Sequence, residues 1–443
     1  MEAILEKAWQ LKQNLIDFVL DAEGELAVAL EGYIATGSSR DRYDIAQQNQ
    51  LVDSFIVEGK VGGRSPLDLF IDTQPDLQES DRILLENWRR SFMGLFEISQ
   101  ILPDGFELIN WLTAKHYTVK VNNPETFKDT AKLKLGEILL VRIAPVTDTY
   151  WMFSGPHILM GKLGKPKLAV AIGNFKQNHK NALYSDAPEL LEQAWQSVEQ
   201  YHEDFTEFFG SDEVTLSGYH LNKKIAEFQE VITKKRLAEA GFDESISLEK
   251  IAAESGVDTA EIKDAATEAG VDANTVDQIL SNKTNSKMVM PKIDLPDSIK
   301  KAEQVTAISH PRWGQMFLLT YAKIKAVLAT EDGQTLPNSE KLVRDYLEDV
   351  TINAFIWRRL AHTYPIQLEK VLQIVLERPD FNLEGDLDAL LQEFNKPLEP
   401  ELPEIASVPL HLHNLFQDAV TEVNKSKSKP QDKKKGSKGF KSS

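Results

Sequence analysis

Apolar residues recur at intervals of three and four along most of the chain, a spacing typical of amphipathic helices. The first such stripe includes Leu11 and Leu15. Further along, Ser65 precedes Pro66. This pair signals a helix start, because serine caps a helix N-terminus and proline fits the first turn. The pattern predicts a helical region over residues 1–93.

Short apolar stretches separated by turn residues replace this pattern between residues 94 and 175. The sequence Pro103-Asp104-Gly105 is one such turn signal. Several short strands joined by tight turns are typical of a small antiparallel sheet or barrel. The strand candidates include Phe106–Leu112, His116–Val121, Glu137–Ile143, Thr149–Phe153 and Leu168–Ile172. Helical spacing returns over residues 186–240, and we expect these helices to pack on the sheet.

An internal repeat occupies residues 247–282, where Glu-Ser-Gly-Val-Asp from Glu254 recurs as Glu-Ala-Gly-Val-Asp from Glu268. Its glycines are natural helix stops, so the segment predicts a three-helix mini-bundle. A helix-turn-helix is the alternative. Residues 241–285 contain ten acids and three lysines, a net charge of −7. Because DNA binding needs a positive surface, we expect no sequence-specific DNA recognition.

A polar, proline-containing stretch over residues 283–296 predicts a linker. Helical spacing then continues to residue 424, which predicts an all-helical C-terminal domain over residues 297–424. The expected fold class is therefore α+β, mostly helical, with one small antiparallel sheet or barrel.

The formal charge of −18 conceals two oppositely charged parts. Residues 425–443 contain eight lysines and one aspartate, so this tail carries +7 and residues 1–424 carry −25. The composition predicts a disordered basic tail. One interpretation is that the tail keeps the protein soluble. The other is that it contacts RNA, a ribosome, an anionic membrane surface or an acidic protein. The candidate polyanion contacts are Lys433, Lys434, Lys435 and Lys438.

The absence of cysteine excludes disulfides, thiolate metal sites and thiol catalysis. Walker A, GxGxxG and GxSxG motifs are absent as well. We therefore expect no catalytic, metal or cofactor site, although dispersed residues could still assemble one. No apolar stretch is long enough for a membrane span and no signal peptide is recognisable, which predicts a cytoplasmic protein.

Two tryptophan–arginine clusters are candidate partner-binding sites, because both residue types are enriched where proteins bind one another. The alternative is that the tryptophans belong to the core. The candidate residues are Arg312, Trp313, Trp357, Arg358 and Arg359.

The stretch DLFIDTQPDLQESDRILLENWRRSFMGLFEISQILPDGFELINWLTAKHYTVKV, Asp68 to Val121, resembles the module upstream of SEC-C motifs in some uncharacterised bacterial proteins. The SEC-C motif itself binds zinc through cysteines, which this chain lacks, so no metal function carries over. The whole chain, particularly Val350–Leu410, is similar to cyanobacterial proteins without known activity. This resemblance implies a phototroph's cytoplasm, near thylakoids or ribosomes.

The function we expect is a non-enzymatic protein-interaction or assembly factor. Several helical modules, an acidic body and the lack of a catalytic motif favour it. One alternative is an RNA- or ribosome-associated protein that uses the basic tail. The other is an enzyme whose site is built from dispersed residues.

Overall fold

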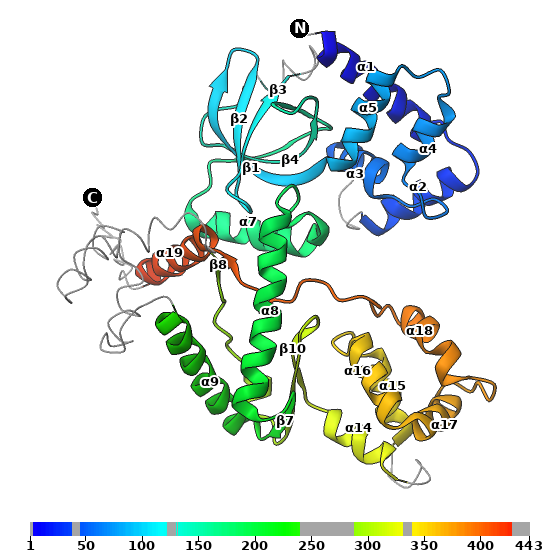
Figure 1. Ribbon diagram of the computed structural model, residues 1–443, viewed down its shortest axis with the longest axis vertical. Coiled ribbons are helices and arrows are strands. Elements are labelled where there is room, and N and C mark those ends of the chain that lie inside the picture. Colours follow the sequence, from blue (N-terminus) through cyan, green and yellow to red (C-terminus); the bar gives the residue numbers. More distant parts are fainter. Residues whose placement is uncertain are drawn as a thin grey trace, which may run out of the picture. The chain divides into compact units, whose positions relative to one another are not determined.

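A computed structural model describes residues 3–37, 45–121, 130, 132–239, 288–330 and 339–427 (Figure 1). The chain forms two compact units. The first unit contains Met1–Leu190 together with Pro409–Ser443, and the second contains Leu191–Val408. The second unit is thus inserted between two segments of the first. The class is α+β, as the sequence predicts.

The first unit begins with a helical layer whose apolar faces form one core. Ser65 caps α4, where its hydroxyl accepts a hydrogen bond from the Asp68 amide at 3.2 Å, and Pro66 occupies the first turn as predicted. The elements are α1 (Ala3–Leu20), α2 (Glu25–Gly37), α3 (Ile45–Glu58), α4 (Pro66–Thr73), α5 (Glu79–Asn87) and the 3-10 helix η1 (Trp88–Arg90). Their core continues onto the strand residues Ala144 and Met152, and onto Val146 and Tyr150 in the loop between these two strands.

A five-stranded closed barrel follows. Its strands are β1 (Phe92–Leu102), β2 (Gly105–Asn110), β3 (His116–Lys120), β4 (Ile138–Pro145) and β5 (Trp151–Phe153). The order is β1-β2-β3-β5-β4, and pairing of β1 with β4 closes the barrel. A sixth strand, β6 (Ile158–Gly161), pairs with β4. The sequence predicted the barrel, but β3 and β5 run parallel, so the sheet is mixed rather than wholly antiparallel.

This strand order, with its parallel β3–β5 pair, is the topology of OB-fold barrels. The strand β1 pairs with β2 at one end and with β4 at the other, so it must bend. At Gly94 a Cβ atom would lie 2.5 Å from the ring of Phe96, so a larger residue would disturb the core. Inside the barrel the Tyr117 ring stands edge-on to Phe96 and Trp151, at 5.8 and 5.3 Å between centroids.

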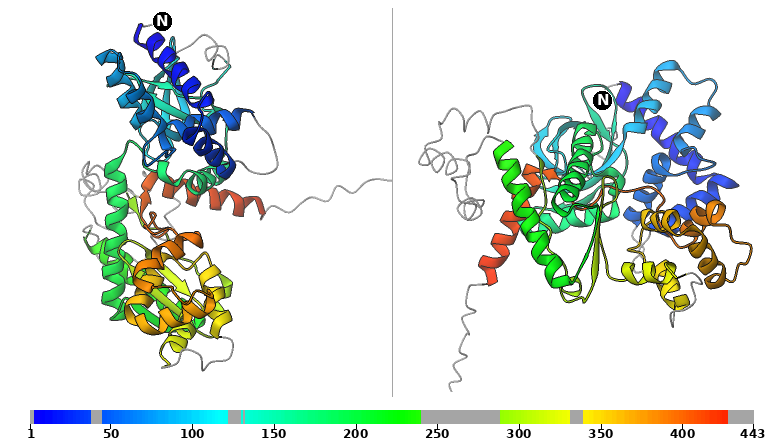
Figure 2. Two further views of the ribbon diagram at one scale, coloured as in Figure 1. Left: turned by 90° about the vertical axis from the view of Figure 1, so that its right-hand side faces the viewer. Right: turned by 60° about the horizontal axis from the view of Figure 1, so that its bottom comes forward.

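Two helices from distant parts of the sequence cover another face of the barrel: α7 (Lys165–Asn178) and α19 (Leu410–Lys427). They lie side by side (Figures 1 and 2) and bury Met93, Leu95 and Ile138. The strand expected at Leu168–Ile172 is therefore wrong. Burial there follows helical spacing, through Leu168, Ala171, Ile172 and Phe175.

The second unit contains α8 (Pro188–Phe209), which begins just before it, and α9 (Gly218–Glu239). We expected these helices to pack on the sheet of residues 94–175. In the structure α8 and α9 belong mainly to the second unit and pack on each other, where Phe228 lies 5.3 Å from Tyr201 and 5.7 Å from Phe205. This helical pair has an aromatic core of its own.

The expectation of an all-helical domain over residues 297–424 is wrong at its start. The strands β9 (Val305–His310) and β10 (Gly314–Leu318) form a hairpin, and β7 (Glu213–Leu216) adds to β9. Both Val305 and Ile308 are fully buried, and the Thr306 hydroxyl lies 2.8 Å from that of Thr215. Their β-branched side chains favour extended backbone.

The remaining elements of the second unit are mainly helices around one apolar core. They are α14 (Tyr321–Leu328), α15 (Ser339–Glu348), α16 (Ala354–Thr363), α17 (Pro365–Val375) and α18 (Leu383–Glu393). The short helix α13 (Asp297–Lys300) has no buried residue and lies against α9 instead. Two short strands also occur, β8 (Met288–Val289) within the predicted linker and β11 (Val408–Pro409). None of the described helices has both the length and the apolar character needed to cross a bilayer.

The mini-bundle predicted over residues 247–282 lies outside the described residues. So does most of the predicted basic tail, because the description ends with α19 at Lys427.

Candidate functional site

The structure separates the five tryptophan and arginine candidates into different environments. Trp357 is 0% exposed and lies in the core of the second unit, 5.5 Å from the Tyr346 ring. The prediction that Trp357 binds a partner at the surface is therefore wrong. On α16 it shares a face with Ile356 and Leu360, and helical periodicity turns that face inward.

The two arginines that follow Trp357 are engaged within the fold. Arg358 donates two hydrogen bonds of 3.1 Å to the carboxylate of Asp388 and one of 3.0 Å to the Leu398 carbonyl. Arg359 bonds Asp212 at 2.5 Å and Glu213 at 3.2 Å, and its hydrogen bond lowers the pKa of the Asp212 carboxyl. Both guanidinium groups join elements of the second unit.

Arg312 and Trp313 occupy the turn between β9 and β10. Arg312 is exposed, and its guanidinium carbon lies 3.9 Å from the ring centroid of Trp195 on α8, a cation–π contact. Trp313 is half-buried and packs against the core of the second unit. We name Trp195, His310, Arg312 and Trp313 the hairpin patch.

His310 holds the turn of the hairpin patch in place. Its Nδ1 atom accepts hydrogen bonds from the backbone amides of Arg312 at 3.0 Å and Trp313 at 3.1 Å. Its ring lies 4.2 Å from that of Phe355, and burial lowers its pKa. A neutral imidazole can accept these bonds, so the patch is a fixed rather than an adaptable surface.

Trp195 is the member of the hairpin patch that the sequence did not single out. Trp195 lies next to Ala194 and three residues before Val198, both of which are buried. Its position in the sequence therefore predicts that it belongs to the buried apolar face of α8. The partial exposure of Trp195 and its contact with Arg312 arise from the fold, which brings residues far apart in sequence together.

A cavity of about 1000 Å³ lies in the first unit, and we name it the α3 cavity. Residues of α2 and α3 form one wall, and the end of α7 with the 3-10 helix η2 (Lys180–Ala182) forms another. The start of β1 and Leu140 of β4 complete it. The lining combines apolar side chains with many amides and hydroxyls.

A buried charge network supports the α3 cavity from behind. The Asp53 carboxylate lies 2.6 Å from Lys12 Nζ and 3.4 Å from Arg142 Nε, and all three side chains are buried. The Ser154 hydroxyl donates to the same carboxylate at 2.9 Å. Arg142 also binds Glu58, which lines the cavity. The network thus fixes a cavity carboxylate from inside the fold.

Two ionisable side chains on the cavity wall have displaced pKa values. Burial raises the pKa of Tyr33 to about 12, assisted by its hydrogen bond of 3.2 Å to Glu58. Burial also lowers the pKa of His179, whose ring stacks on Phe175 at 4.9 Å. Near neutral pH both side chains are therefore uncharged.

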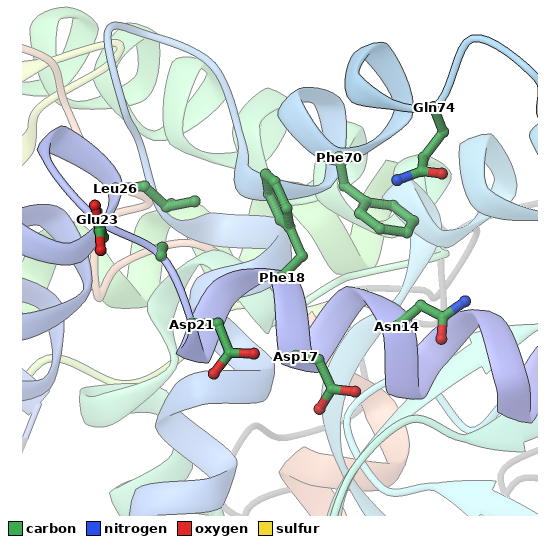
Figure 3. Close-up of a pocket in the computed structure, with 9 residues that line it drawn as sticks. Asn14, Asp17, Phe18, Asp21, Glu23, Leu26, Phe70 and Gln74 are labelled. Atoms are coloured by element: carbon green, nitrogen blue, oxygen red, sulfur yellow. The ribbon is translucent and has the colours of Figure 1, made fainter.

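A second, more open hollow of about 620 Å³ lies beside α1 and is acidic at its edge (Figure 3). The rings of Phe18 and Phe70 form its apolar part, 5.4 Å apart. Figure 3 shows the carboxylates of Asp17 and Asp21 on the other side of α1 from the Phe18 ring. They do not converge on a point, and no group of three metal-ligating side chains occurs within the described ranges.

The outer face of β2 and β3 is where OB-fold barrels bind oligonucleotides. Here Thr118 donates to Glu107, and Lys120 pairs with Asp104 at 3.1 Å. The exposed large hydrophobic side chains among the described residues include no aromatic of the barrel. Among its described residues this face presents no exposed Phe, Tyr or Trp ring on which single-stranded nucleic acid could stack, and its Lys120 is paired.

The candidate polyanion contacts Lys433, Lys434, Lys435 and Lys438 lie outside the described residues. In comparisons with known proteins, no family model matches the chain, and neither a curated protein nor a solved structure proved similar to it.

Proposed function

We propose that the protein is a non-enzymatic interaction or assembly factor of the cytoplasm, which binds a partner protein through the hairpin patch. The observation that carries the proposal is the exposed guanidinium of Arg312 on the Trp195 ring. The contacts of Arg312 within the described ranges are the Trp195 ring and, through its backbone amide, His310. Arginine and tryptophan are the side chains most enriched at binding hot spots.

The chemistry of the patch indicates the kind of partner. The exposed guanidinium of Arg312 attracts an acidic group on a partner. The half-buried Trp195 and Trp313 offer apolar surface beside it. We infer that the partner presents a carboxylate next to an apolar side chain. The resemblance to cyanobacterial proteins favours a partner from a phototroph.

The test is affinity purification of the full chain from its native cells, with Arg312→Ala and Trp313→Ala beside the unchanged protein. The matched control is Arg378→Ala, which removes an exposed arginine of the same unit that is paired with Glu393 at 3.0 Å. We expect one defined complex, lost in the first two variants and retained in the control. Equal recovery with all four proteins would contradict the proposal.

A binding assay with the purified partner then separates direct from indirect capture. A photo-reactive residue in place of Trp313 should form a cross-link to one acidic segment of the partner. The same residue in place of Arg378 should form none. Cross-links from both positions, or from neither, would speak against a site at the hairpin patch.

The alternative function is association with RNA or ribosomes through the basic tail. The composition of residues 425–443 favours it, whereas the paired charges on the β2–β3 face do not add to it. Removal of residues 425–443 should then abolish sedimentation with ribosomes, and rising salt should weaken it steeply. Unchanged sedimentation of the shortened chain would eliminate this alternative.

A further inference from the structure

The negative charge of the chain is concentrated in the second unit. Residues 191–408 contain 22 lysines and arginines against 39 acids, a net charge of −17. Residues 1–190 and 409–443, the first unit, contain 28 lysines and arginines against 29 acids, a net charge of −1. Salt screens charges beyond about 8 Å, so a partner on the first unit meets mainly the charges of that unit. An anionic partner can therefore bind there.

The first unit contains a basic segment without acids. Residues 149–185 include five lysines and neither aspartate nor glutamate. This segment forms β5, β6, α7 and η2. Exposed lysines and apolar side chains gather where β6 ends and α7 begins. We name this group the β6–α7 surface, and its residues are Leu159, Met160, Lys162, Lys165, Lys167 and Val170.

The fold keeps the side chains of the β6–α7 surface close together. The strand β6 ends at Gly161 and α7 begins at Lys165, so only a short turn separates them. Lys167 and Val170 are three residues apart on α7, a spacing that makes them neighbours on the helix surface. Val170 is 63% exposed, whereas Ile172 of the same helix is buried in the core. The surface therefore presents cations and apolar side chains side by side.

The apolar part of the β6–α7 surface indicates the kind of anionic partner. Leu159, Met160 and Val170 are aliphatic, and Leu159 is 47% exposed. Single-stranded nucleic acid is bound by aromatic rings on which its bases stack. Aliphatic side chains beside lysines are typical of segments that lie in the headgroup region of a membrane. This combination favours an anionic lipid surface over RNA.

The helix α19 connects the basic tail to the same part of the first unit. It lies beside α7 (Figures 1 and 2), and its Asp418 pairs with Lys165 at 2.6 Å. Asp418 precedes the last residue of α19, Lys427, by nine residues, a rise of about 14 Å. The eight lysines of residues 425–443 begin in the last turn of this helix. A polybasic segment and exposed apolar side chains are two signals that together anchor a protein to a membrane.

We propose that the β6–α7 surface, together with the basic tail, binds the headgroup layer of an anionic lipid membrane. Lys162 and Lys167 contact the phosphate groups, because both side chains are exposed, whereas Lys165 is engaged by Asp418. Leu159, Met160 and Val170 enter the apolar edge of the layer. The site lies in the first unit, so it does not depend on the hairpin patch.

The test is flotation of the full chain with vesicles of phosphatidylcholine alone and of phosphatidylcholine and phosphatidylglycerol in equal parts. We expect binding to the anionic vesicles to be at least about tenfold tighter and to weaken as salt rises, because lysines are attracted to the anionic surface. Arg312→Ala should leave this binding unchanged, because the hairpin patch belongs to the second unit. No binding to anionic vesicles, or equal binding to both kinds, would overturn the proposal.

Replacement of lysines separates the β6–α7 surface from the tail. Lys162→Gln combined with Lys167→Gln should weaken binding about fivefold for each lysine, equivalent to about 1 kcal/mol. The control combines Lys60→Gln with Lys223→Gln, which changes the net charge equally at two other exposed lysines. Equal binding by the two double variants would show that the surface has no part in membrane contact.

Replacement of an apolar side chain separates lipid from RNA. Leu159→Ser should weaken vesicle binding about five- to tenfold, since less apolar area leaves water, and Val28→Ser, at an exposed site of α2, should not. Single-stranded polyuridylate is the competing polyanion. Binding to this RNA that depends on Lys162 and Lys167, without binding to anionic vesicles, would assign the surface to RNA and overturn the proposal. Equal vesicle binding by Leu159→Ser and Val28→Ser would refute the role of the apolar side chains.

Discussion

Replacement of Asp53 by asparagine should destabilise the first unit more than any other single change in the buried charge network. Asp53 is the anion between two buried cations, Lys12 and Arg142, at 2.6 and 3.4 Å. At an effective dielectric constant of about 20, an ion pair at 2.6 Å has an attraction of about 6 kcal/mol. Desolvation offsets much of this, but the loss of one partner leaves buried charges uncompensated, at a cost of about 3–5 kcal/mol.

Lys12→Met is the informative comparison. It removes one cation and leaves Asp53 paired with Arg142 and hydrogen-bonded to Ser154. The expected loss is therefore smaller, about 1–3 kcal/mol, the value of a hydrogen bond to a charged group. Both variants should keep the second unit unchanged, because the network lies wholly in the first.

Urea denaturation followed by hydrogen exchange of the β4 amides measures the free energy of unfolding of the first unit separately from the second. The reasoning is refuted if Asp53→Asn costs less than Lys12→Met. It is also refuted if Asp53→Asn costs less than about 1 kcal/mol, the range of exposed ion pairs.

Three further outcomes test the core, the titratable groups and a helix cap. Trp357→Ala should destabilise the second unit by about 3–5 kcal/mol, measured as a lower urea midpoint, because it empties a fully buried site. Burial lowers the pKa of His179, His411 and His413, so the unfolded first unit binds more protons than the folded one below about pH 6.5. Its stability should be constant above that pH and should fall as the pH drops toward the folded-state pKa values; an unchanged urea midpoint between pH 7.5 and pH 5 would contradict this. Ser65→Ala should cost about 1 kcal/mol through the lost α4 cap, whereas Ser65→Gly should cost only a few tenths, both measured by thermal unfolding.

Strong local patterns predicted the α+β class and many of the helices. The helix start at Ser65 could be predicted because its cap needs only adjacent residues. Short apolar stretches were harder, since a strand and one turn of helix share the same composition. Leu168–Ile172 was therefore predicted as a strand, although it lies in α7. Val305–His310 was predicted as part of an all-helical domain, although it forms β9.

How well the site residues could be predicted depended on how far apart in sequence the residues that form each site lie. Arg312 and Trp313 were singled out by residue type alone, and the hairpin turn that presents them was not predicted. The same argument failed for Trp357, where helical periodicity was the better guide. Lys12, Asp53 and Arg142 carry no local signal, since three separate elements bring them together.

The return of the chain to the first unit at Pro409 has a consequence for biosynthesis. Leu412 and Leu415 of α19 complete the core that covers Met93 and Leu95 of the barrel. A ribosome makes about 5–20 residues per second, so α7 covers this apolar face without α19 while the whole inserted unit is synthesised. The nascent first unit is then a natural client for chaperones, and its folding ends only after α19 has been synthesised.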